Sequence, residues 1–221
     1  MSTAIARGLR HKACALALPA FPLVLLIGSL VSPTDSSENA DQLRAAATHG
    51  GRWQGAALLE LLAAALLPFA VAAVVGVVRG RGARLANVGA VLGVLGTLGM
   101  ASIALRHVYV YGLADSGQAV ALHAIDRIDN QAGAIALPLM FAAPVALIML
   151  AVATARARLV HRWVIAAAVV FFLSDMLPIP AGELLQGVVG IVTFGTIGRR
   201  IMRLDEQSGE ETVRRLEPAA A

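Results

Sequence analysis

Apolar residues gather in blocks along the chain, and polar residues fall mainly between the blocks. A helix that crosses the hydrocarbon core of a bilayer needs about 20 largely apolar residues. Six blocks reach or approach this length, and each predicts one membrane-spanning helix: about 13–31, 53–78, 85–107, 131–155, 163–177 and 183–197. We therefore predict an all-α fold, a polytopic integral membrane helical bundle with a single transmembrane domain over residues 1–203.

The first block has a second interpretation. Arg7, Arg10 and Lys12 precede its apolar run, as basic residues precede the apolar region of a secretory signal peptide. The run is longer than that region usually is, and no small-residue cleavage site directly follows Val31. We favour a retained helix.

The last two blocks are short and are separated by Pro178 and Pro180. Two prolines so close cannot both lie inside a helix, so the chain must turn there. A helix over 163–177 would be roughly 22 Å long, less than a hydrocarbon core of about 30 Å, which places the turn below the outer surface. Irregular backbone at that depth is tolerated where it is buried in protein or lines a water-filled cavity. The sequence thus predicts a polar depression open to the outside.

Lysine and arginine residues indicate the orientation, because cytoplasmic loops carry an excess of both. With the N-terminus in the cytoplasm, 14 of the 18 lie on the inner side. The four others are Arg44, Arg52, Arg106 and Arg127. We predict that both termini are cytoplasmic, that residues 204–221 form a charged cytoplasmic tail, and that the protein is a multi-pass protein of the cell inner (plasma) membrane.

Composition excludes several other classes of protein. The chain of 221 residues is 58% hydrophobic and 14% charged, where a soluble domain has about 25% charged residues. The net charge of +4 comes from residues at the block ends rather than from one patch, which argues against nucleic acid as a partner. Cys14 is the one cysteine and can form neither an internal disulfide nor a thiolate metal cluster. We predict no cofactor.

Three further segments predict local structure. A glycine row, Gly89, Gly93, Gly96 and Gly99, keeps largely to one face of the third helix and predicts close helix packing. Residues 36–50 predict a short helix with Ser36 or Ser37 as N-cap and Gly50 as C-cap. Residues 116–128 predict a loop segment that lies along the outer interface.

Acidic residues inside apolar blocks are the main functional candidates, since a charge at the bilayer centre costs at least about 2.5–3.5 kcal/mol. Glu60 and Asp175 lie within the second and fifth blocks, and Glu183 begins the sixth. All three fall in the outer half of the membrane under the predicted topology. We take Glu60 and Asp175 as candidate catalytic acids and Glu183 as a binding residue.

Other polar residues reach the same level. The candidate binding residues among them are Arg106, His107, Tyr109, His123, Asp126 and Asp129. Structural roles remain open for each: Arg106 could pair with Glu60 or Asp175, Glu183 could cap its helix, and Tyr109 could belong to an interfacial aromatic belt. The H-x-x-D-x-x-D spacing from 123 to 129 could suggest a metal site. On one helix, however, residues i and i+6 lie on nearly opposite faces, so the three side chains could not bind one ion together. We therefore predict a polar loop face and no metal.

The chain is rich in Ala, Gly, Val and Arg, and it carries Gly55-x-x-x-x-Glu60 after Trp53 and Arg84-x-x-x-x-Gly89. In these features it resembles small, uncharacterised polytopic membrane proteins of actinobacteria. That resemblance covers most of the chain and implies no assigned activity. A looser resemblance is to small integral-membrane terpene cyclases, which implies that membrane-embedded acids, here Glu60 and Asp175, protonate an epoxide or alkene. The chain departs from that family in its six expected spans and its aromatic content of 5%.

Motifs of hydrolases, nucleotide-binding proteins and zinc proteases are absent from the sequence. Our first hypothesis is therefore a protein whose outward-facing acidic pocket binds a membrane lipid or a hydrophobic, amphipathic small molecule. The second is a membrane-embedded cyclase-like enzyme of natural-product biosynthesis that uses acid protonation. The third is a small transporter subunit, which would need a homo-oligomer to build a path.

Overall fold

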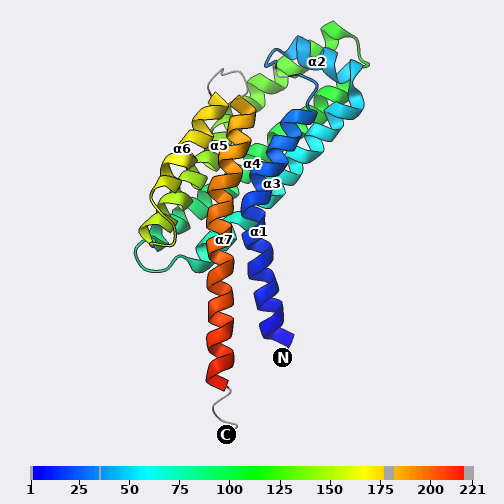
Figure 1. Ribbon diagram of the computed structural model, residues 1–221. Helices are drawn as coiled ribbons and strands as arrows, with labels where there is room; N and C mark the ends of the chain where they lie inside the picture. Colours follow the sequence, from blue (N-terminus) through cyan, green and yellow to red (C-terminus); the bar gives the residue numbers. More distant parts are fainter. Residues whose placement is uncertain (1, 35, 177–181, 217–221) are drawn as a thin grey trace.

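The computed structural model describes residues 2–34, 36–176 and 182–216, and this part of the chain forms seven α-helices (Figure 1). They are α1 (Ser2–Val31), α2 (Asn39–Thr48), α3 (Gly50–Val77), α4 (Ala83–Leu113), α5 (Gln118–Arg156), α6 (Trp163–Met176) and α7 (Gly182–Leu216). The predicted all-α class is confirmed.

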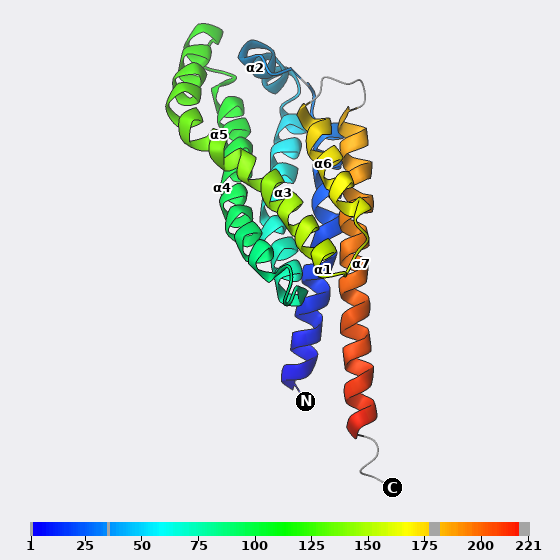
Figure 2. The ribbon, with the colours of Figure 1, turned by 90° about the vertical axis from the view of Figure 1, so that its left-hand side faces the viewer.

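The long helices lie side by side in one bundle. Helix α1 packs against α3 and α7, α4 packs against α3 and α5, and α6 contacts both α5 and α7. The two ends of the chain lie at the same end of the bundle, where α1 and α7 project beyond the other helices (Figures 1 and 2). The short helix α2 lies at the opposite end, so polar groups near α2 are far from the termini.

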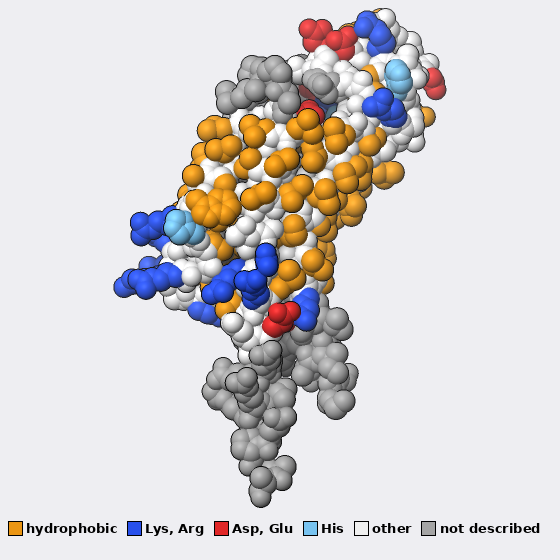
Figure 3. All heavy atoms as spheres, viewed as in Figure 1, with side chains coloured by type: hydrophobic (Ala, Val, Ile, Leu, Met, Phe, Trp, Pro, Cys, Tyr) orange, Lys and Arg blue, Asp and Glu red, His pale blue; other side chains and the backbone are white. Residues whose placement is uncertain are grey.

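Four of the described helices are long and apolar enough to cross a membrane: Lys12–Val31, Gly50–Val77, Ala83–Leu113 and Gln118–Arg156. Their outer faces expose large apolar side chains, among them Leu58, Val91 and Ile135. Figure 3 shows hydrophobic side chains as a band on one face of the bundle, with most basic residues of that face below the band, toward the termini, and acidic residues mainly above it. These features indicate a membrane protein.

The last two expected spans are different from the first four. The apolar part of α6 covers only Trp163–Ser174, and α7 begins at Gly182 and continues to Leu216, through most of the expected tail. The charged tail is therefore helical as far as that residue. The Pro178–Pro180 turn lies outside the described residues.

The glycine row on α4 packs as predicted. All four glycines are buried, and a Cβ built on Gly96 would lie 2.5 Å from the backbone nitrogen of Ala143 on α5. A Cβ on Gly93 would lie 2.6 Å from a methyl group of Val71 on α3, and one on Gly99 would collide with the backbone of Leu139. Helix α4 can approach its neighbours this closely only because the side chains are missing.

Two segments at the α2 end differ from expectation. The residue before α2 is Glu38, which makes no side-chain capping bond, and the helix ends at Thr48 with His49 as its C-cap, so neither the predicted serine cap nor the Gly50 cap is present. Residues 118–128 belong to α5 and are not a loop. They are held in helical form because Ala121 and Ile125 are buried in a small second core with residues of α2, α3 and α4.

Candidate functional site

A pocket of about 550 Å³ opens among the helices toward the α2 end of the bundle. Its apolar lining includes four phenylalanine rings: Phe21, Phe141, Phe171 and Phe172. Its polar lining includes hydroxyl side chains and two amides: Ser29, Ser32, Thr34, Ser36, Ser37, Gln42 and Gln186. The pocket therefore combines apolar and polar side chains in one cavity, and all seven described helices contribute residues to it.

Glu60 and His107 form a hydrogen-bonded pair in this pocket. Oε2 of Glu60 lies 2.7 Å from Nδ1 of His107, and their side chains are 27% and 21% exposed. Trp53 fixes the histidine, because its indole N–H donates to the backbone carbonyl of His107 at 2.7 Å and its ring meets the imidazole edge to face at 5.0 Å. Both side chains line the pocket, and a carboxyl group and an imidazole are among the groups that enzymes use most often for proton transfer.

Glu183 lies in the wall of the same pocket, with Gln186 beside it. It stands in the first turn of α7, where a negative charge meets the positive end of the helix dipole. Both of its expected roles, capping the helix and lining a polar pocket, fit this position. The side chain of Asp175, the second candidate acid, is outside the part of the chain whose side chains are described, although its backbone belongs to α6.

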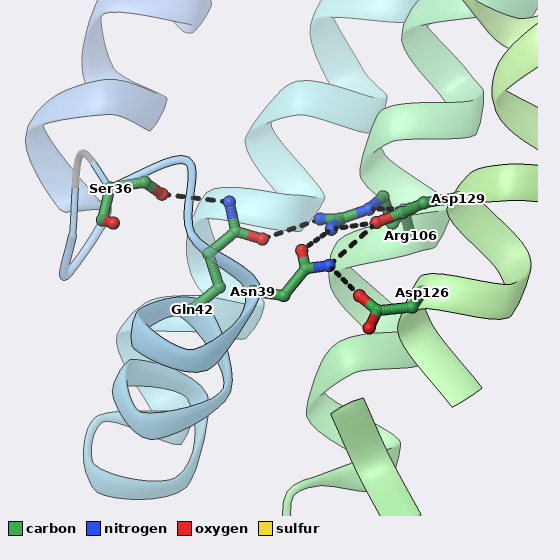
Figure 4. A network of polar contacts seen from close by, with 6 residues as sticks. All are labelled: Ser36, Asn39, Gln42, Arg106, Asp126 and Asp129. Carbon is green, nitrogen blue, oxygen red and sulfur yellow. Dashed lines mark hydrogen bonds and ion pairs between the residues drawn. The ribbon is translucent and has the colours of Figure 1, made fainter. Parts of the chain in front are cut away.

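Arg106 forms the centre of a separate polar network (Figure 4). Its guanidinium donates to both carboxylate oxygens of Asp129, at 2.7 Å and 2.9 Å. It also donates to the side-chain carbonyls of Gln42, at 2.7 Å, and Asn39, at 2.6 Å. The amide nitrogen of Asn39 in turn donates to Asp126 at 2.8 Å and to Asp129 at 3.2 Å. The network joins α2, α4 and α5.

Arg106 thus pairs with Asp129, and Glu60 has His107 as its partner. The expected pairing of Arg106 with Glu60 is therefore wrong, for a geometric reason, whereas the alternative pairing with Asp175 involves a side chain outside the described part of the chain. Successive residues of an α-helix point about 100° apart, so the neighbours Arg106 and His107 face different sides of α4. Arg106 faces α2 and α5, and His107 faces α3 and the pocket.

The H-x-x-D-x-x-D residues lie on α5 rather than on a loop. Asp126 and Asp129 are one turn apart and converge on Asn39, whereas His123 is exposed to the surroundings. Among the described residues, no group of three His, Cys, Asp or Glu side chains is placed to hold a metal ion. Tyr109 is 39% exposed on the surface of α4.

Three contributors to these sites were missed by sequence reasoning: Ser36, Asn39 and Gln42. Ser36 accepts a bond from the amide of Gln42 through its backbone carbonyl at 3.0 Å, so the chain before α2 is tied to the same network. The signal was present as a polar face on the predicted short helix. What the sequence could not supply was the neighbour that this face contacts.

Comparison with protein-family models, curated proteins and solved structures gives no match for this chain.

Proposed function

We propose that the protein is a multi-pass protein of the plasma membrane with six spans and both termini in the cytoplasm. The four long apolar helices support four of these spans. The fifth and sixth spans would be α6 and the first part of α7. Helix α6 has 14 residues and α7 begins at Gly182, which is consistent with two short neighbouring spans. The unequal distribution of arginines, 14 of 18 basic residues on the side of the termini, supports the orientation.

In this orientation the pocket faces the outer leaflet, and we infer that it binds an amphipathic, lipid-like small molecule. The single observation behind this inference is a lining that combines four phenylalanine rings with hydroxyl and amide side chains and the Glu60–His107 pair. Ligand pockets are mainly apolar, with a few polar groups that orient the ligand. A molecule with an apolar body and a hydrogen-bonding head matches this mixed lining.

A pocket-filling substitution tests the binding proposal. Ser29 on α1 lines the pocket, and its hydroxyl bonds only within its own helix, so Ser29→Phe fills space without breaking a tertiary contact. The next residue, Leu30, is 58% exposed on the outer face, and Leu30→Phe is the matched control. We expect molecules that co-purify with the protein, measured by mass spectrometry of extracts, to be lost from Ser29→Phe and kept by Leu30→Phe. Equal recovery from both variants contradicts the proposal.

A second candidate function is acid-catalysed cyclisation or isomerisation in the same pocket. The observation in its favour is that the Glu60–His107 pair shares the pocket with aromatic rings, whose faces stabilise positive charge that develops on a substrate. Membranes that contain the protein would be incubated with prenylated epoxides and alkenes. A cyclised product that disappears in Glu60→Gln and Asp175→Asn would establish the enzyme, and no turnover over the panel would leave the binding proposal.

A further inference from the structure

A second depression, of about 1180 Å³, lies between the connection from α3 to α4 and the connection from α5 to α6. It is on the side of the bundle that carries the basic residues, opposite α2 (Figure 3). Five arginines line it: Arg81, Arg84, Arg156, Arg158 and Arg162. His161 completes the polar lining, and none of the described residues that line the depression is acidic.

None of these five guanidinium groups has a hydrogen-bond or ion-pair partner within the described part of the chain. All five side chains are exposed. The contrast with Arg106 is clear, because that guanidinium is bonded to Asp129, Gln42 and Asn39. Five unpaired cations around one concave surface repel one another, and an anion in the depression would relieve this repulsion.

The two connections are packed together by their backbones. A Cβ on Gly82, just before α4, would lie 2.5 Å from the backbone oxygen of Ala153 near the end of α5. The arginines of the first connection are therefore held beside those of the second by a contact that only glycine permits. The fold therefore fixes the backbone positions of these arginines, while their exposed side chains remain free to move.

The end of α5 has an unusual residue at its turn. The amide of Leu159 bonds to the carbonyl of Thr154 at 3.0 Å, and the amide of Arg158 bonds to that of Ala155 at 3.1 Å, which is the Schellman pattern. The residue in the left-handed position is Arg158, with φ of 58°, where glycine is usual because it has no Cβ. Within the described residues it is the one non-glycine residue with positive φ. An arginine at this place puts a cation over the depression at a conformational cost that glycine would avoid.

We propose that this depression binds the phosphate headgroup of an anionic phospholipid. Apolar residues lie next to the arginines in the same lining, among them Leu85, Val152, Leu159 and Ile165, and they provide a surface for the start of an acyl chain. Basic pockets between membrane helices on the cytoplasmic side suit such headgroups. The proposal is independent of the outer pocket, and it uses only the proposed orientation, which places this end at the cytoplasmic leaflet.

The test measures lipid retention by the full-length protein. Detergent-purified protein would be titrated with phosphatidylglycerol or with phosphatidylcholine of the same acyl chains, and bound lipid counted by native mass spectrometry. The variant is Arg81→Gln/Arg84→Gln/Arg162→Gln, and the matched control is Arg199→Gln/Arg200→Gln/Arg203→Gln. The control removes the same charge from exposed residues of α7 that do not line the depression. We expect the apparent affinity for phosphatidylglycerol to fall roughly 10- to 100-fold in the variant and much less in the control.

Arg158→Gly gives a second readout that a loss of folding cannot imitate. It removes one cation and relieves the left-handed strain, so we expect a higher unfolding temperature without lipid together with weaker retention of phosphatidylglycerol. Competing inorganic phosphate distinguishes the source of the anion, and a single-stranded oligonucleotide tests a polynucleotide. The proposal is overturned if phosphatidylcholine binds equally well, if the variant and control behave alike, or if millimolar phosphate or the oligonucleotide displaces the lipid completely.

Discussion

Replacement of Arg106 by alanine should release α2 from the rest of the bundle. The substitution removes both bonds to Asp129 and the bonds to Asn39 and Gln42. It leaves Asp129 with Asn39 as its described partner, at 3.2 Å. The apolar contact of α2 with the small core, through Leu43 and Ala46, is unchanged.

The magnitude follows from the exposure of the pair. Exposed ion pairs contribute about 0–1 kcal/mol, and loss of one partner of a buried pair costs about 3–5 kcal/mol. The side chains of Arg106 and Asp129 are 23% and 34% exposed, between these limits. We therefore expect α2 docking to weaken by about 2–3 kcal/mol, which is a roughly 30- to 150-fold rise in the undocked population.

Hydrogen exchange of the backbone amides in α2, followed by mass spectrometry, measures this population directly. Arg106→Lys should show a smaller rise, because lysine keeps the charge but cannot make the two parallel bonds to a carboxylate. Arg127→Ala is the matched control, since Arg127 is exposed on α5 and has no partner among the described residues. The reasoning is refuted if exchange in α2 is unchanged by Arg106→Ala, or if Arg127→Ala raises it equally.

Three other predictions concern packing, topology and the pocket. Gly96→Ala should destabilise the protein by about 1–3 kcal/mol in detergent unfolding, because its Cβ meets the backbone of α5. The control Gly112→Ala on the same helix meets nothing within 4 Å and should be neutral or stabilising. Equal effects of the two substitutions would contradict the packing argument. A reporter that is active only in the cytoplasm should work when fused after Arg203 and fail when inserted near Ser116, and the reverse pattern would refute the orientation. A cysteine at Glu60, with the native cysteine replaced by serine, should react with an impermeant thiol reagent added from outside; an unreactive cysteine would show a closed, dry site.

The helices could be predicted because their signals are local. Blocks of apolar residues predicted segments within α1, α3, α4, α5 and α6 from hydropathy alone, and the glycine row predicted the face of α4 that packs. The α5 extension could not be predicted in the same way. Asp126 and Asp129 were predicted to be loop residues from their polarity, but they are helical because Ala121 and Ile125 are buried against other helices. That burial is a tertiary effect.

The site residues show the same division. Glu60 and Arg106 were found because charges in or near apolar blocks need partners. Their partners were not predicted, since a choice between His107, Asp129 and Asp175 depends on which helix lies on each side of α4. The indole of Trp53 had no marker in the sequence, and the polar face that carries Gln42 gave no sign of the helix it contacts, because the importance of both side chains comes from the atoms they meet.

Gln42 connects the two polar sites of this protein. Its side chain accepts a bond from Arg106, and the same residue lines the pocket that contains Glu60. Occupancy of the pocket and attachment of α2 are therefore linked equilibria whenever a ligand contacts the Gln42 side. A molecule that binds more tightly with α2 attached must hold α2 in place by the same factor by which α2 strengthens its binding.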